Sequence, residues 1–147
     1  MTLAGALVEL FVTDALGSGT WETASPMIWS RRLLAVFFNL TGTLHFVIPR
    51  SYEAMVPQPV PAKEAVAVSG VAEILGGLAV LHPASRRLGR WWLLALLIAV
   101  FPANVHMAVS PEQIRGLDLN KVPRWVLWAR LPLQPLAMLW VWRATRD

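Results

Sequence analysis

The chain has 147 residues, of which 56% are hydrophobic and only 15% are charged, and its mean hydropathy is +0.51. This composition excludes an ordinary water-soluble domain of this length and predicts an integral membrane protein with one domain. The net charge of +4 does not indicate nucleic-acid binding, because the basic residues lie between apolar runs and form no continuous stripe. Without cysteine, redox chemistry would need a bound cofactor or a partner protein.

Residues 1–27 are predicted to be an N-terminal extension outside the main domain. Their apolar run, residues 3–12, carries Glu9 and is soon followed by Asp14. This run is too short to cross a bilayer comfortably and lacks the basic start of a secretory signal peptide. We expect a short interfacial helix or an irregular extension here.

Residues 28–147 contain four apolar segments that are long enough to cross a bilayer as helices. The segments cover residues 33–48, 63–81, 91–109 and 123–142. Four prolines in the first connection, residues 49–61, predict an extended or re-entrant loop, and the basic residues 85–90 predict a short turn. The expected fold class is therefore an all-α integral membrane four-helix bundle.

An even number of spans places both termini on the same side of the membrane. Seven of the Lys and Arg residues flank the spans on that side, and five flank them on the other. Because cytoplasmic loops carry the excess of basic residues, this distribution favours cytoplasmic termini.

The strong polar residues of the four segments share one layer of the bilayer. Distances from the helix ends that face the outer loops follow from a rise of about 1.5 Å per residue. They are about 6 Å for His45, about 14 Å for Glu73, about 9 Å for Asn104 and about 10 Å for Arg130. Such convergence predicts a single polar pocket below the proline-rich loop.

Glu73 is the only ionisable residue of the apolar run 65–81. A carboxylate at that depth costs about 3 kcal/mol on insertion scales unless a partner or a cavity receives it. Arg130 is the expected partner, and two interpretations of the pair stay open. It can be a buried ion pair that fixes helix packing, or Glu73 can act as a general acid or base while Arg130 orients it or binds an anionic or carbonyl group.

Other polar residues extend the candidate site. His45 and His106 can exchange protons with Glu73, so these three residues are the catalytic candidates. Two histidines and a carboxylate can also bind iron or copper, but no local spacing such as His-Glu-x-x-His occurs, so no metal site is predicted. The candidates for ligand binding are polar or aromatic side chains in or next to the same layer: Arg130, Asn104, Gln134, Ser69, Tyr52 and Trp128.

Five motifs occur in one order along the chain: GTLHFVIP at 42–49, VPQPVP at 56–61, SGVAEILGG at 69–77, FPANVHM at 101–107 and WARLPLQ at 128–134. Together they resemble the DoxX-like family of small four-helix membrane proteins over about residues 32–143. The resemblance implies a multi-pass protein of the bacterial plasma membrane. It also implies a loose link to quinone-coupled sulfur oxidation, oxidative-stress complexes or maturation of redox enzymes.

Three functions remain open at this stage. In the first, the pocket holds a small lipophilic ligand, with a quinone as the candidate cofactor, and serves a redox process with a partner protein. In the second, the protein is a membrane enzyme that uses Glu73, His45 and His106 for isomerisation, cyclisation or hydration of a lipophilic substrate. In the third, it is a structural assembly subunit. Whether the protein is an enzyme is therefore open.

Overall fold

The computed structural model describes residues 26–113 and 123–146, and all regular structure in these residues is helical. The all-α prediction is confirmed for them. The predicted extension lies outside the described residues except for its last two positions, which begin the first described helix. The helices are α2 (Pro26–Val47), α3 (Pro49–Glu53), α4 (Ala62–Ala79), α5 (Pro83–Val109), the 3-10 helix η1 (Pro111–Gln113) and α6 (Arg124–Ala144).

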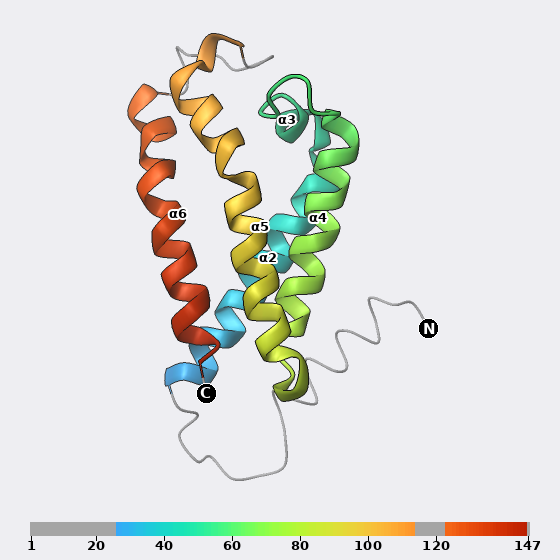
Figure 1. The fold of residues 1–147 in the computed structure, drawn as a ribbon, viewed down its shortest axis with the longest axis vertical. Coiled ribbons are helices and arrows are strands. Elements are labelled where there is room, and N and C mark those ends of the chain that lie inside the picture. The colour runs from blue at the N-terminus through green and yellow to red at the C-terminus, as the bar shows by residue number, and fades with distance from the viewer. Residues whose placement is uncertain (1–25, 114–122, 147) are drawn as a thin grey trace.

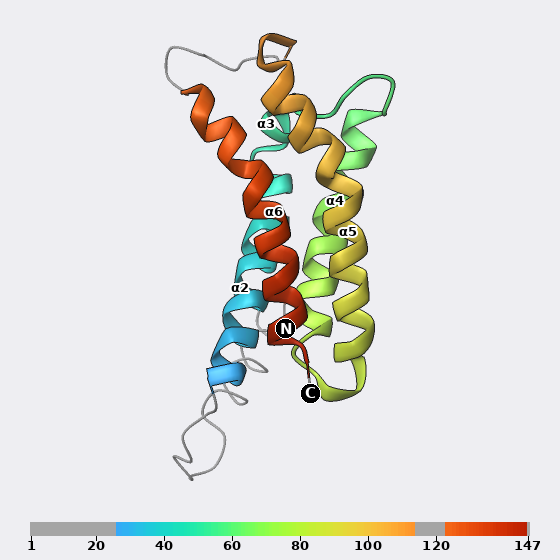
Figure 2. The same ribbon diagram turned by 60° about the vertical axis from the view of Figure 1, so that its left-hand side comes forward.

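The four long helices alternate in direction and form a ring in the order α2, α4, α5, α6 (Figures 1 and 2). The packing of α2 on α4 is the most extensive. The start of α2, the connection from α4 to α5 and the end of α6 lie at one end of the bundle, called here the turn end. The opposite end carries α3 and η1 and is called the α3 end.

The connections differ from two predictions. Residues 85–90 are helical rather than a turn, because α5 already begins at Pro83 after the N-cap residue His82, whose Nδ1 accepts a hydrogen bond from Ala84 N at 3.3 Å. Residues 49–61 are not extended throughout, since Pro49 occupies the first turn of α3. In both places proline starts a helix by fixing φ, a role that the predictions overlooked.

A cluster of buried apolar side chains fills the interior of the bundle near the turn end. It joins side chains of α2, α5 and α6 with the C-cap residue of α4, Val80, and all are buried almost completely: Leu34, Ala35, Phe38, Val80, Leu93, Leu94, Val141 and Ala144. Fewer apolar side chains are buried at the α3 end, where Met107 and Leu127 pack with Ala54 and Met55. The space for a ligand therefore lies in the half of the bundle next to α3.

Two glycines allow α2 and α4 to approach closely. A Cβ added to Gly70 would lie 2.8 Å from Cβ of His45 and 3.0 Å from the carbonyl oxygen of Gly42. A Cβ added to Gly42 would lie 2.8 Å from the carbonyl oxygen of Gly70 and 3.0 Å from Cβ of Glu73. Any larger residue at either position would push the helices apart, so this contact sets the distance between His45 and Glu73.

Among the described helices, α5 alone meets the combined criteria of length, hydropathy and low charge for a membrane span. The helix α4 has 18 residues but includes Lys63, Glu64 and Glu73. By these criteria the prediction of four spans is supported for α5 only.

Candidate functional site

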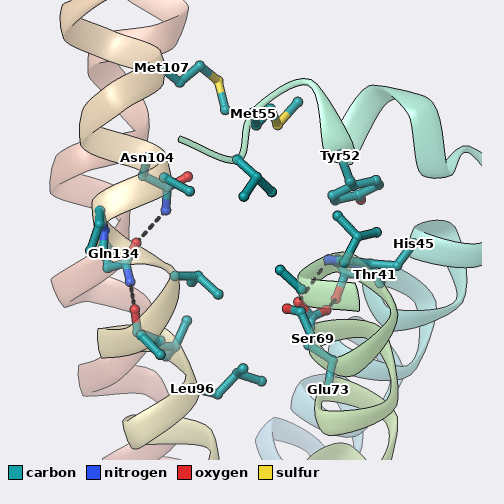
Figure 3. Close-up of a pocket in the computed structure, with 18 of the residues that line it drawn as sticks. Thr41, His45, Tyr52, Met55, Ser69, Glu73, Leu96, Asn104, Met107 and Gln134 are labelled. Atoms are coloured by element: carbon teal, nitrogen blue, oxygen red, sulfur yellow. Dashed lines mark hydrogen bonds and ion pairs between the residues drawn. The ribbon is translucent and has the colours of Figure 1, made fainter. Parts of the chain in front are cut away.

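A cavity of about 610 Å³ lies between the α2–α4 pair and the α5–α6 pair, on the side of α3. Most of its lining is apolar, and its polar side chains other than Arg130 form two opposed walls (Figure 3). The acid wall consists of Thr41, His45, Tyr52, Ser69 and Glu73, and the amide wall consists of Asn104 and Gln134. A ligand in the cavity would therefore meet polar groups on two sides and apolar side chains elsewhere.

The acid wall is centred on Glu73. The Thr41 hydroxyl donates to Oε2 of Glu73 at 2.5 Å, and Nε2 of His45 lies 3.7 Å from Oε1. The other ring nitrogen of His45, Nδ1, lies 2.9 Å from the carbonyl oxygen of Thr41. Because a carbonyl oxygen only accepts hydrogen bonds, Nδ1 carries a proton. This contact fixes both the orientation and the tautomer of the imidazole.

Because Nδ1 is bound to Thr41 O, Nε2 is the ring nitrogen of His45 that faces the Glu73 carboxylate. In a neutral imidazole, Nε2 has only a lone pair, which an ionised carboxylate 3.7 Å away repels. A proton on Nε2 produces an ion pair, and a proton on Glu73 produces a neutral carboxyl group; either one removes the repulsion. Thr41 suits both states, since its oxygen also lies 3.0 Å from Phe37 O and 3.2 Å from Phe38 O and can donate there instead. At 3.7 Å the contact between Nε2 and Oε1 is longer than a hydrogen bond and is an ion pair only when the imidazole is protonated.

Tyr52 covers His45 from the side of α3. The two rings are stacked, with centroids 3.9 Å apart and planes at 26°. Burial raises the pKa of Tyr52, the Glu73 carboxylate raises it further, and the positive charge of Arg130 opposes both effects. The phenol therefore remains a hydrogen-bond donor at neutral pH.

Ser69 lies in the same wall, one helical turn before Glu73. Its hydroxyl oxygen is buried and has no hydrogen-bond partner among the described residues. A buried hydroxyl without a partner costs about 1–3 kcal/mol. A ligand oxygen or a water molecule in the cavity would satisfy it.

The amide wall links α5 to α6. Nδ2 of Asn104 donates to Oε1 of Gln134 at 2.6 Å, and Nε2 of Gln134 donates to the carbonyl oxygen of Leu97. Pro102 lies inside α5 and has no N–H to bond the carbonyl oxygen of Ile98, next to Leu97. Oδ1 of Asn104 makes no hydrogen bond within the described part of the chain and faces the cavity as an acceptor.

The expected ion pair between Glu73 and Arg130 is not formed. Both residues line the cavity, but the ion-pair partner of Glu73 in the described residues is His45. Arg130 is exposed instead, and its Nη1 donates to Sδ of Met107 at 3.4 Å. The partners of the Glu73 carboxylate thus lie on the neighbouring helix α2 and not on α6.

Seven of the nine predicted site residues line the cavity: Glu73, His45, Arg130, Asn104, Gln134, Ser69 and Tyr52. His106 does not line it, and Trp128 does not either and is 52% exposed. Trp128 lies two positions from the lining residue Arg130, which turns it about 200° around α6, whereas His106 lies directly before the lining residue Met107. No group of three or more potential metal-binding side chains converges in the described residues. The iron or copper alternative needed two histidines, but only His45 lines the cavity.

The predictions also missed Thr41, which makes the shortest contact with Glu73. Its position, four residues before His45, places both side chains on the same face of α2 and was a usable signal. The neighbouring Thr43 donates its hydroxyl within α2, to Asn39 O at 2.7 Å.

Comparison with known proteins gives a match over residues 34–145 to a family model described as Domain of unknown function (DUF8561). No curated protein and no solved structure matches the chain. The matched range includes every residue that lines the cavity.

Proposed function

The chain belongs to the family described as Domain of unknown function (DUF8561), and we propose that it is an integral membrane protein whose cavity binds a small lipophilic ligand of the quinone class. In this proposal the protein serves a redox process together with a partner protein. The observation that carries the proposal is the pair of polar walls on opposite sides of an otherwise apolar cavity.

Support for a membrane environment comes from the outer surface of the bundle. Large apolar side chains are exposed on all four long helices, for example Leu40, Val68, Ile98 and Leu136. The most apolar 18-residue stretch of α5 is only 17% buried, unlike the core helix of a soluble protein. Soluble monomers rarely expose continuous apolar patches above about 600 Å², whereas lipid tails cover such surfaces.

The charges of α4 are compatible with a span. Lys63 and Glu64 occupy its first turn, where side chains reach the interface, and only Glu73 lies deep. Eighteen helical residues extend about 27 Å, close to the thickness of a bilayer core of about 30 Å. A multi-pass protein of the bacterial plasma membrane with cytoplasmic termini, as the DoxX-like resemblance implies, is the form that we propose.

The ligand class follows from the chemistry of the walls. A cavity of about 610 Å³ suits a small organic molecule. Tyr52 and Ser69 offer hydroxyl donors on one wall, and Asn104 offers the acceptor Oδ1 on the other. A flat ring with oxygen atoms on opposite edges and apolar substituents would suit both walls, because a quinone oxygen accepts from Tyr52 or Ser69 and the hydroxyl of the reduced quinol donates to Asn104.

A bound quinone would supply the electron-carrying chemistry and take up protons as it is reduced. The residues of the chain would bind the ring oxygens, exclude bulk water and hold a proton between His45 and Glu73. The chain has no cysteine, so electrons would come from or pass to a partner protein.

A second function is favoured by one observation. The Nδ1–H contact of His45 with Thr41 O orients Nε2 toward a carboxylate, as in general acid–base catalysis. An enzyme that isomerises, cyclises or hydrates an uncoloured lipid would use the same wall. A structural assembly subunit would need the pair only for packing.

Co-purification separates these functions. Wild-type protein, Glu73→Gln and the control Trp128→Phe would be purified in mild detergent, and the retained small molecules identified by mass spectrometry and difference spectroscopy. We expect a quinone in the wild type and the control but not in Glu73→Gln. Turnover of an uncoloured lipid that stops in Glu73→Gln would establish the second function instead. If no preparation retains or converts a small molecule, both are excluded.

A further inference from the structure

Charge is divided unevenly between the two ends of the bundle. At the α3 end and in its half of the bundle, four basic side chains balance four acidic ones in the described residues. At the turn end, the described residues include no acidic side chain and seven arginines from three helices: Arg31 and Arg32 of α2, Arg86, Arg87 and Arg90 of α5, and Arg143 and Arg146 at the end of α6. The described residues of the turn end therefore carry a concentrated positive charge.

Two of these arginines, Arg31 of α2 and Arg90 of α5, bind the C-terminal end of α6. Nε of Arg31 donates to the carbonyl oxygen of Ala144 at 3.1 Å. Nε of Arg90 donates to the Thr145 hydroxyl at 3.0 Å, and its Nη2 donates to the Thr145 carbonyl oxygen. Both contacts cap the end of α6, where its free carbonyls carry partial negative charge. They hold α2, α5 and α6 together and so keep the remaining arginines on one surface.

Tryptophans lie at the same level. The guanidinium carbon of Arg32 lies 5.3 Å from the ring centroid of Trp29, and that of Arg90 lies 5.3 Å from that of Trp142. Trp91 packs edge-on against Trp142, with centroids 5.6 Å apart. Trp29 and Trp91 are both more than half exposed. Exposed indoles next to arginines, above an apolar lateral surface, are typical of the headgroup layer of a bilayer.

We infer that the turn end is a binding surface for the phosphate groups of anionic phospholipids. The inference rests on the membrane location proposed above and adds a preference for the class of lipid. The described residues do not supply enough acidic side chains to balance this end. Even if all four acids near the chain ends that lie outside the described residues, Glu9, Asp14, Glu22 and Asp147, were counted there, the balance would remain positive by three. Anionic headgroups supply the missing charge, because each arginine near such a surface favours them about fivefold.

The surface can be weakened without touching the helix caps or the cavity. Arg87, Arg143 and Arg146 are exposed, so Arg87→Gln/Arg143→Gln/Arg146→Gln removes three charges from the turn end. The matched control, Arg50→Gln/Lys63→Gln/Arg124→Gln, removes three exposed charges from the opposite half. Both triple variants have the same net charge.

The test uses the full chain in nanodiscs with equal amounts of phosphatidylglycerol and phosphatidylcholine, followed by native mass spectrometry of the retained lipids. We expect the wild type and the control to retain phosphatidylglycerol preferentially. The turn-end variant should lose about tenfold or more of this preference, and added salt should weaken it in the wild type. Equal retention of both lipids by the wild type, or equal losses in the two variants, would overturn the inference.

Flotation with phosphatidylcholine vesicles keeps the two proposals apart. Protein that does not float with the vesicles is not membrane-embedded, and the proposed function then fails together with this inference. Protein that floats but shows no preference for the anionic lipid refutes this inference alone.

Discussion

Replacing Gly70 by alanine tests whether the close contact of α2 and α4 assembles the acid wall. The added Cβ would lie 2.8 Å from Cβ of His45, whereas ordinary contacts begin at 3.4 Å, so the helices must separate by about 0.6 Å. Overpacking of this kind costs about 1–3 kcal/mol of unfolding free energy. It also moves His45 away from Glu73, so ligand affinity should fall about tenfold, or about 1.4 kcal/mol.

The matched control is Gly76→Ala in the same helix. Its added Cβ would collide with the buried side chain of Leu93 and lie 3.0 Å from Cδ1 of Trp92, both on α5, so it would strain the contact of α4 with α5 rather than the contact with α2. Thermal unfolding of the detergent-solubilised protein measures stability, and quenching of tryptophan fluorescence by a short-chain quinone measures affinity. We expect both variants to lose stability but only Gly70→Ala to lose affinity. Wild-type affinity in Gly70→Ala, or equal losses in both, would refute the reasoning.

Three further predictions concern the walls of the cavity. Thr41→Val removes the hydroxyl that donates to Glu73 and should lower the unfolding free energy, measured by chemical denaturation, by about 1.5–3 kcal/mol. The control Thr43→Val, on the exposed side of α2, should lower it by less than about 0.5 kcal/mol. Gln134→Leu breaks both hydrogen bonds of the amide wall and should lower the unfolding free energy by about 1–3 kcal/mol; an unchanged midpoint of thermal unfolding would contradict this. Tyr52, the only tyrosine, should ionise above its ordinary pKa of 10.0 because it is buried, so phenolate absorbance should appear late in an alkaline titration. The contribution of the protonated phenol to the free energy of unfolding is complete below pH 10.0 and should be lost as the pH rises through the raised pKa of Tyr52. Arg130→Gln removes a positive charge that lowers this pKa, so phenolate absorbance should then appear at a still higher pH.

The sequence predicts the depth of the polar residues better than their direction. Depth follows from a constant rise per residue, and it correctly brings Glu73, His45 and Asn104 to one cavity. Direction depends on how each helix is rotated in the bundle, which is set by packing between helices that are distant in the chain. His106 and Trp128 lie close along their helices to lining residues but do not line the cavity.

The partner of Glu73 illustrates the same limit. Arg130 was chosen for its opposite charge, but the contact between Gly42 and Gly70 brings α2 closest to α4. Thr41 and His45 on α2 therefore reach the carboxylate first. Two of the motifs contain these glycines, yet only the packed structure identifies them as facing each other.

The central claim is that both walls of one cavity face the same lipophilic ligand. Photolabelling with a light-activated short-chain quinone, followed by peptide mapping of the full chain in nanodiscs, tests it most directly. We predict labels in residues 41–57 and 97–107, from both sides of the cavity, and their loss when unlabelled quinone is in excess. Labels confined to the outward-facing side chains of the bundle, or unaffected by the competitor, would contradict the claim.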